Sequence, residues 1–121
     1  MQSQTSTSAL LSPVLKNGTA LLRYAASAVV PTSVDWIKAT GGAAGIVLTL
    51  TPAIFATGDP TSPTYLYQTY FATKDDAAAG LVSFVDPNGA LFNGQPSWDL
   101  VNQYQWAIFV WDGIGWHVIG N

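Results

Sequence analysis

The closing stretch of the chain constrains the fold most, because it places two β-rich runs on either side of a tight-turn pair. Tyr104–Trp111 reads YQWAIFVW, Trp116–Ile119 reads WHVI, and Asp112-Gly113 lies between them. Glycine takes up the positive φ of a hairpin turn without steric cost, so we expect an antiparallel hairpin here. A hairpin alone is not stable in water, and its large rings must therefore pack against other strands or a second subunit. The side chains that we expect to pack between subunits are Trp106, Phe109, Trp111 and Trp116.

Similar strand-like runs begin at Thr40. Gly45–Thr51 alternates apolar and β-branched residues, Tyr65–Ala72 alternates about an aromatic set, and Leu81–Val85 is short and almost wholly apolar. Clusters of Gly, Pro, Asp and Asn separate the runs, as turns do. The pattern predicts an all-β domain over residues 32–121, built as an antiparallel β-sandwich or a barrel-like module.

The N-terminal region is of a different character. Its first eighteen residues are polar, then sparsely apolar, and fit an extended arm as well as a frayed terminus. Residues 19–28 favour a short helix that begins at Thr19 as N-cap, although a strand over Ala28–Val30 is nearly as good an interpretation. We assign residues 1–31 to the arm. The side chains expected to anchor it on a neighbouring surface are Leu10, Leu11, Val14 and Leu15.

The chain is unusually poor in charge. Only 9% of its 121 residues are charged and none is Glu, whereas an average soluble domain carries about 25% charged residues. Hydrophobic residues make up 49% of the chain. A surface with so few charges must rely on neutral polar groups or be covered by a partner, which favours a protein that works inside an assembly.

Several classes of protein are excluded by composition. The chain has no cysteine, which rules out disulfide frameworks, cysteine-based metal sites and thiol nucleophiles. Its net charge is −3 and its four basic residues are scattered, which argues against a nucleic-acid partner. No apolar run reaches the roughly 18 residues of a membrane span, and the start of the chain lacks the basic segment of a signal peptide. We expect neither a nucleic acid nor a membrane as partner.

The titratable residues suggest no catalytic site. His117 is the only histidine, no partner for it is recognisable by spacing, and a strand histidine that faces solvent or a subunit seam is the better interpretation. Asp75-Asp76, with Asp86 or Asp59, offers oxygen ligands, but the regular loop that organises calcium ligands is missing. Aspartates that bond their own backbone in turns explain the pair better.

Two further motifs also fail as sites of chemistry. Glycoside hydrolysis needs two placed carboxyl groups, whereas this chain has no Glu and most of its aspartates lie in turns. Gly41–Gly45 is glycine-rich but precedes a strand, while phosphate-binding loops follow one. We therefore predict no catalytic, cofactor or metal residues and do not expect an enzyme.

From Gly45 to its end the chain resembles a β module widespread in tailed bacteriophages, found in tail-fibre segments and in small head-fibre or capsid-decoration proteins. The resemblance lies in the order of weak motifs, since each motif alone is common. The residues before it match nothing in that module. The motifs are Ile46–Leu50, Tyr65–Phe71, Lys74-Asp75-Asp76, Ala77–Gly80, Leu81–Val85, Asp86-Pro87-Asn88-Gly89, Phe92-Asn93-Gly94 and the final Tyr104–Ile119 with Asp112-Gly113 and Trp116.

The resemblance implies a structural role in a virion. Members of this group usually assemble as trimers, so it implies a homotrimer that binds and stabilises the assembled major capsid protein on the capsid surface. A single module between Met1 and Asn121 favours a decoration protein over a long tail fibre. The alternative function is a tail-fibre tip that binds a receptor or a host-surface glycan through its exposed aromatic residues.

Overall fold

The computed structural model describes residues 20–55 and 66–121, and only the backbone of the short strands Ile54–Phe55 and Leu66–Tyr67. Within these ranges the protein is all-β, as predicted, and contains no helix. Its strands are β1 (Leu21–Tyr24), β2 (Ala28–Val30), β3 (Trp36–Ala39), β4 (Ile46–Leu50), β5 (Ile54–Phe55), β6 (Leu66–Tyr67), β7 (Thr69–Lys74), β8 (Val82–Val85), β9 (Trp98–Leu100), β10 (Trp106–Trp111) and β11 (Trp116–Gly120).

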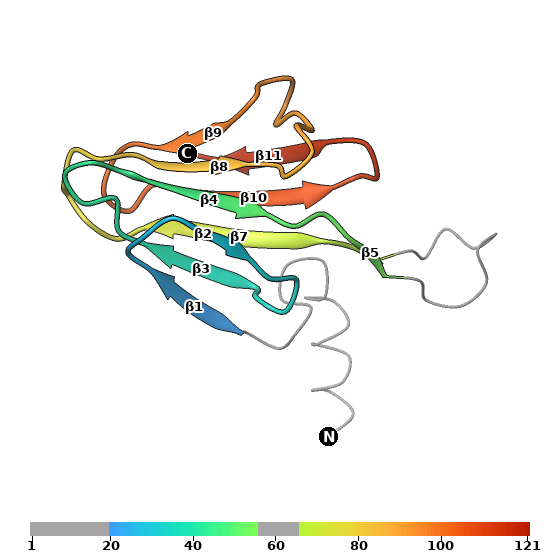
Figure 1. Cartoon of the computed structure of the whole chain (residues 1–121), viewed down its shortest axis with the longest axis horizontal. Helices are drawn as coiled ribbons and strands as arrows, with labels where there is room; N and C mark the ends of the chain where they lie inside the picture. The colour runs from blue at the N-terminus through green and yellow to red at the C-terminus, as the bar shows by residue number, and fades with distance from the viewer. Residues whose placement is uncertain (1–19, 56–65) are drawn as a thin grey trace.

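The strands form two main sheets and one small one. The five-stranded sheet has the order β1-β3-β7-β10-β11, the four-stranded sheet has the order β2-β4-β8-β9, and β5 pairs with β6. In Figure 1 the four-stranded sheet lies in front of the five-stranded one. Buried side chains of both sheets belong to one core, an arrangement compatible with a β-sandwich.

The antiparallel pairing that we predicted is wrong for the first half of the chain. β1 pairs with β3 and β3 with β7 in parallel, and in the other sheet β2 pairs with β4 and β4 with β8 in parallel. From β1 to β4 the chain alternates between the two sheets, so β2 joins the parallel strands β1 and β3, and β3 joins β2 and β4. Parallel neighbours usually need a long crossover, most often a helix. Here a strand of the opposite sheet takes that place, and both sheets are mixed.

The last strands close the fold in the predicted way. β10 and β11 form the antiparallel hairpin, with Trp111 opposite Trp116. In its turn the Asp112 carboxylate accepts hydrogen bonds from the N–H groups of Ile114 and Gly115, both at 2.8 Å, and Gly113 has a φ of 95°. β10 also pairs antiparallel with β7.

The short helix expected over residues 19–28 is wrong where the structure describes them, because β1 and β2 occupy this stretch. The Tyr24 carbonyl accepts the N–H of Thr40 at 3.0 Å, and the Ala20 carbonyl accepts the N–H of Asp35 at 2.8 Å, so pairing with β3 outweighs a weak local helix preference. The boundary that we placed after residue 31 therefore separates β1 and β2 from the two sheets to which they belong. The strand interpretation of Ala28–Val30 is confirmed.

Aromatic side chains join the two sheets in the core. Phe84 of β8 and Phe109 of β10 lie 4.6 Å apart between ring centres, and Phe92 stacks on Trp116 at 5.8 Å. The Tyr70 hydroxyl of β7 lies 3.2 Å from the carbonyl of Thr51, just beyond β4. These contacts hold β7, β10 and β11 against the four-stranded sheet.

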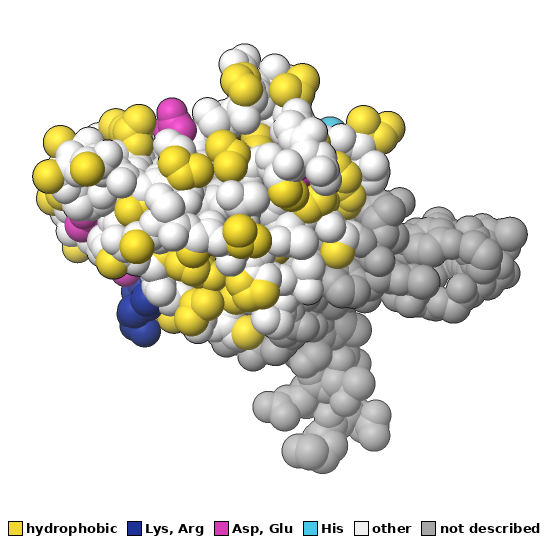
Figure 2. All heavy atoms as spheres, viewed as in Figure 1, with side chains coloured by type: hydrophobic (Ala, Val, Ile, Leu, Met, Phe, Trp, Pro, Cys, Tyr) yellow, Lys and Arg dark blue, Asp and Glu magenta, His cyan; other side chains and the backbone are white. Residues whose placement is uncertain are grey.

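The outer side of the four-stranded sheet is mixed in character. Figure 2, taken from that side, shows hydrophobic side chains dotted among polar ones, and very few charged groups. Val29 and Val47 are the exposed apolar residues of β2 and β4. No helix in the described residues is long and apolar enough to cross a membrane.

Candidate functional site

The outer side of the five-stranded sheet carries a continuous row of aromatic rings. Trp36, Phe71 and Trp106 come from β3, β7 and β10, and their neighbours Ile37, Ala72 and Ala107 along the strands are buried. Because side chains alternate along a strand, the three aromatic residues point away from the core. The ring centres lie 5.7 Å apart between Trp36 and Phe71 and 6.3 Å apart between Phe71 and Trp106.

Beyond Trp106 the same side of the sheet is apolar over β10 and β11 except at His117. Ile108 lies between Phe71 and Ile119 in the strand register, and Val110 lies opposite His117. Ile119 is 62% exposed and the others are partly exposed. We call Trp106, Ile108, Val110 and Ile119 the apolar patch.

A pocket opens on the other half of this sheet side, where β3 and β7 end. Its volume is about 450 Å³, and two aromatic and three polar residues line it: Trp36, Lys38, Thr73, Asp75 and Tyr104. Clefts that bind small ligands usually measure about 300–1,000 Å³ and combine apolar walls with a few placed polar groups. The pocket has this composition.

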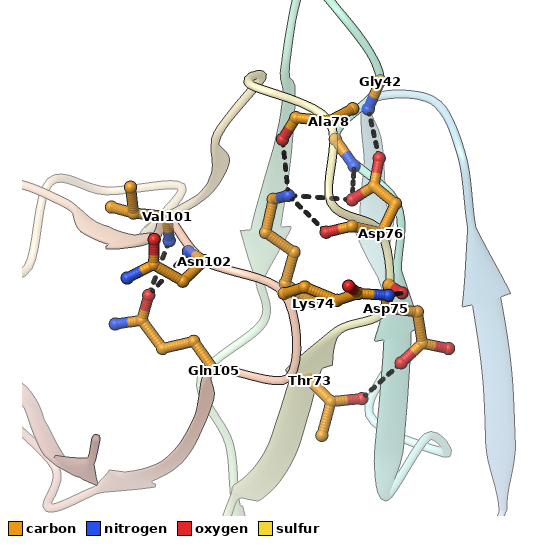
Figure 3. Close-up of polar contacts among 11 residues, drawn as sticks. Gly42, Thr73, Lys74, Asp75, Asp76, Ala78, Val101, Asn102 and Gln105 are labelled. Carbon is orange, nitrogen blue, oxygen red and sulfur yellow. Dashed lines mark hydrogen bonds and ion pairs between the residues drawn. The ribbon is translucent and has the colours of Figure 1, made fainter.

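The polar groups of the pocket are joined to one another. Lys38 Nζ lies 3.3 Å from Asp75 Oδ2 and 5.4 Å from the centre of the Trp36 ring. The Thr73 hydroxyl donates to Asp75 Oδ1 at 3.3 Å, as Figure 3 shows. The lysine and the aspartate are 26% and 32% exposed, so the pair remains open to a ligand.

Tyr104 has a strained backbone that the fold holds in place. Its φ is +67°, in the left-handed region that L-residues rarely adopt, and its side chain is largely exposed. The Tyr104 N–H donates to the Lys74 carbonyl at 2.7 Å. The Gln105 side chain accepts the N–H groups of Val101 and Asn102, which ties the preceding turn together (Figure 3).

Lys74 fixes the turn beside the pocket from the inside. It is fully buried, and its Nζ lies 2.8 Å from the Asp76 carbonyl, 2.9 Å from the Ala78 carbonyl and 2.9 Å from Asp76 Oδ1 (Figure 3). The ammonium group has three N–H donors, so every donor has an acceptor. Because alternate residues of β7 point to opposite sides, Lys74 points inward while Thr73 and Asp75 reach the pocket.

The Asp76 carboxylate is the most strongly stabilised anion of this region. Lys74 donates to it, and so do the N–H groups of Gly42 at 2.9 Å and Gly41 at 3.0 Å. The hydrogen bond from Lys74 is the largest cause and the two glycine amides add to it, and together they lower the pKa of Asp76 to about 2. We call Lys74, Asp76 and the Gly41–Gly42 amides the Lys74 cluster.

The glycine-rich loop is explained by close backbone packing. A Cβ on Gly80 would lie 2.3 Å from the Gly42 carbonyl oxygen and 2.3 Å from the Gly45 nitrogen, and one on Gly41 would lie 2.1 Å from the Gly80 carbonyl oxygen. Only glycine fits at such a contact. This loop holds the Lys74 cluster against the start of β4.

Asp112 and Asp86, outside the pocket and the Lys74 cluster, each have polar partners of their own. His117 Nε2 is 2.6 Å from Asp112 Oδ2 at the exposed hairpin, so the histidine faces solvent as expected. The N–H groups of Gly115 and Ile114, and then His117, lower the pKa of Asp112. Asp86 accepts the Trp116 indole N–H at 3.0 Å and the N–H of Asn88 in its own turn. Asp75 and Asp76, for which we predicted such local backbone bonds, instead bind Lys38 and Lys74, and Asp76 also accepts the distant Gly41 and Gly42 N–H groups.

The structure places the predicted site residues in different environments. Phe109 and Trp116 are buried in the core of their own chain, so they do not pack between subunits, and Trp111 lies 5.3 Å from the Trp116 ring. Trp106 does point outward. Asp59 and the anchoring residues Leu10, Leu11, Val14 and Leu15 lie outside the described residues. Within the described ranges, no three His, Asp or Glu side chains gather in a way that could hold a metal ion.

Sequence reasoning missed most of the pocket. The alternation in Trp36–Ala39, WIKA, was a usable signal, because it places Trp36 and Lys38 on one side of a strand. Nothing in the sequence marks Tyr104 as left-handed. No protein-family model matches the chain, and it has no significant similarity to any curated protein.

Proposed function

We propose that the protein is a structural protein of a tailed-phage virion, located on the capsid surface, where it binds and stabilises the assembled shell as a homotrimer. The observation that carries the proposal is the apolar patch on the outer side of β10 and β11. The order of motifs from Gly45 onward, which resembles phage decoration modules, points in the same direction.

The apolar patch has the composition of an interface. The centres of protein interfaces are poor in charge and rich in aromatic residues, and β10 and β11 together carry His117 as their sole titratable side chain. Burial of apolar surface contributes about 25 cal/mol per Å², so a few hundred Å² per subunit contributes several kcal/mol. Three copies joined through this patch would cover Trp106 and Ile119.

Binding to the shell would stabilise it by mass action. A ligand that binds only the assembled state stabilises that state by RT ln(1 + L/Kd), where L is the free ligand concentration and Kd is its dissociation constant. In a trimer the three contacts are linked, which raises the effective concentration at each site. The proposed contacts to the major capsid protein are made by Leu10, Leu11, Val14 and Leu15 of the arm.

The oligomeric state tests the first half of the proposal. Sedimentation of the full-length protein should give a trimer, and Ile119→Lys should shift it toward monomer, because the lysine would be buried without a partner. Val29→Lys is the matched control, since Val29 is 67% exposed on the other sheet. A monomeric wild-type protein would overturn the trimer.

Shell binding tests the second half. Purified protein should bind saturably to expanded shells that lack it and raise their melting temperature. Deletion of residues 1–18 should abolish attachment and leave the trimer intact. Absence of binding by the wild-type protein overturns the decoration role.

A further inference from the structure

We propose that the pocket lined by Trp36, Lys38, Thr73, Asp75 and Tyr104 binds a neutral pyranose ring of a saccharide. This inference goes beyond the role on a capsid and does not depend on it. The pocket lies over β3 and β7, whereas the apolar patch lies over β10 and β11.

The lining matches the two-sided chemistry of a sugar ring. A pyranose has an apolar face of C–H groups and an edge of hydroxyls. Trp36 and Tyr104 supply rigid aromatic surface for the apolar face, while Lys38, Thr73 and Asp75 supply donors and acceptors for the edge. A purely apolar ligand would take solvent away from the donors and acceptors of these three groups that their own contacts leave unused, at a cost in free energy.

The charge of the pocket favours a neutral ligand. Lys38 and Asp75 are paired at 3.3 Å, so the pocket holds one positive and one negative charge. The ammonium group has two donors beyond the pair, and the carboxylate has acceptor positions beyond Lys38 and Thr73. Sugar hydroxyls, which both donate and accept, can use both groups at once. A phosphate or a carboxylate would meet Asp75 as a like charge.

The walls of the pocket are held in advance of binding. Tyr104 keeps a φ of +67°, and such strained residues gather at ligand sites, where the surrounding structure holds them in place. The N–H of Asp75 donates to the Ala39 carbonyl at 2.8 Å, and the Asp75 carbonyl accepts the Gln103 side-chain amide at 3.0 Å. Because the backbone of Tyr104 and Asp75 is already fixed, binding of a ligand has less conformational entropy of the chain to remove.

Titration of the full-length protein with free sugars tests the inference. The probes are the methyl glycosides of glucose, galactose, mannose and N-acetylglucosamine, followed by saturation-transfer NMR and tryptophan fluorescence, with glucose 6-phosphate as the charged probe. We expect saturable binding in the millimolar range for at least one neutral glycoside and weaker binding of the phosphate. Failure of all four neutral probes overturns the proposal. Tighter binding of the phosphate than of any neutral probe overturns the assignment of a neutral ligand.

Three variants of two residues locate the site. Tyr104→Gly removes the ring and relieves the positive φ, so the fold should be kept while affinity falls about tenfold or more. Asp75→Asn keeps the shape and should also weaken binding, whereas Tyr104→Phe should retain most of it. Ile114→Ala, at the exposed hairpin tip, is the matched control. Binding that survives both Tyr104→Gly and Asp75→Asn overturns the assignment of the site, and shell attachment, measured in parallel, should be unchanged in both variants.

Discussion

Two lysine–aspartate pairs lie at the end of β7, and they differ in almost every physical respect. Lys74 is fully buried, and all its donors are used by Asp76 and the Ala78 carbonyl. Lys38 and Asp75 are both partly exposed and are joined by one contact of 3.3 Å. Asp75 and Asp76 are neighbours in the sequence but lie in different environments. Successive side chains along this stretch point to opposite sides of the sheet, so Asp75 lies with Lys38 on the outer side while Asp76 lies with Lys74.

The difference between the pairs separates structure from binding. Asp76 is 22% exposed, but Lys74 is fully buried, so removal of either partner leaves a buried charge or buried carbonyls without a partner, whereas an exposed pair contributes little to stability. The Lys74 cluster therefore fixes the turn over residues 75–78. The Lys38–Asp75 pair adds little to the fold and remains free to exchange its contacts with a ligand.

Gly80→Ala should have the largest effect, because it pushes away the glycine-rich loop whose Gly41 and Gly42 N–H groups bind Asp76. The new Cβ would lie 2.3 Å from backbone atoms of Gly42 and Gly45, which cannot give way as a flexible side chain can. We expect a loss of about 3 kcal/mol or more in the free energy of unfolding, measured by urea denaturation. Gly89→Ala, with a φ of +79° but open space around it, should lose only about 1 kcal/mol. Equal losses of unfolding free energy in the two variants would show that the close backbone contact at Gly80 is not the cause of the destabilisation.

Lys74→Met comes next. The methionine fills a similar volume but leaves the carbonyls of Asp76 and Ala78 without their donor, so we expect a loss of about 3 kcal/mol in the free energy of unfolding. Chemical denaturation at neutral pH measures it. A neutral result would mean that solvent reaches these carbonyls and that the Lys74 cluster is dispensable.

Acid should weaken the fold through the same cluster. The pKa of Asp76 is lowered from its ordinary 3.8 to about 2, so its stabilising contribution is complete above about pH 4 and is lost as the pH falls toward 2. We expect the melting temperature of the wild-type protein to fall more steeply over this range than that of Asp76→Asn, which has no carboxylate to protonate. Parallel curves would contradict the assignment.

The exposed pair should give the smallest effect. Lys38→Met should change the free energy of unfolding by less than about 1 kcal/mol, and a double-mutant cycle with Asp75→Asn should give a coupling of similar size. A coupling as large as the loss in Lys74→Met would mean that both pairs hold the fold together.

Much of the local structure could be predicted from the sequence. The alternation of Ile46, Leu48 and Leu50 marks the buried face of β4, and Asp112-Gly113 marks the final hairpin. The parallel pairing could not be predicted, because one to three strands separate the parallel partners along the chain and no local signal records the pairing. The burial of Lys74 was equally hidden, since its acceptors are mostly backbone carbonyls, which carry no sequence signature.

The passage of the chain back and forth between the two sheets limits how this architecture can change. Loss of β3 alone would send every following strand to the wrong layer and turn core residues such as Leu48 toward water. Related architectures should therefore lengthen or shorten by whole circuits of two strands, one for each layer, while single loops such as the β10–β11 turn are free to vary in length.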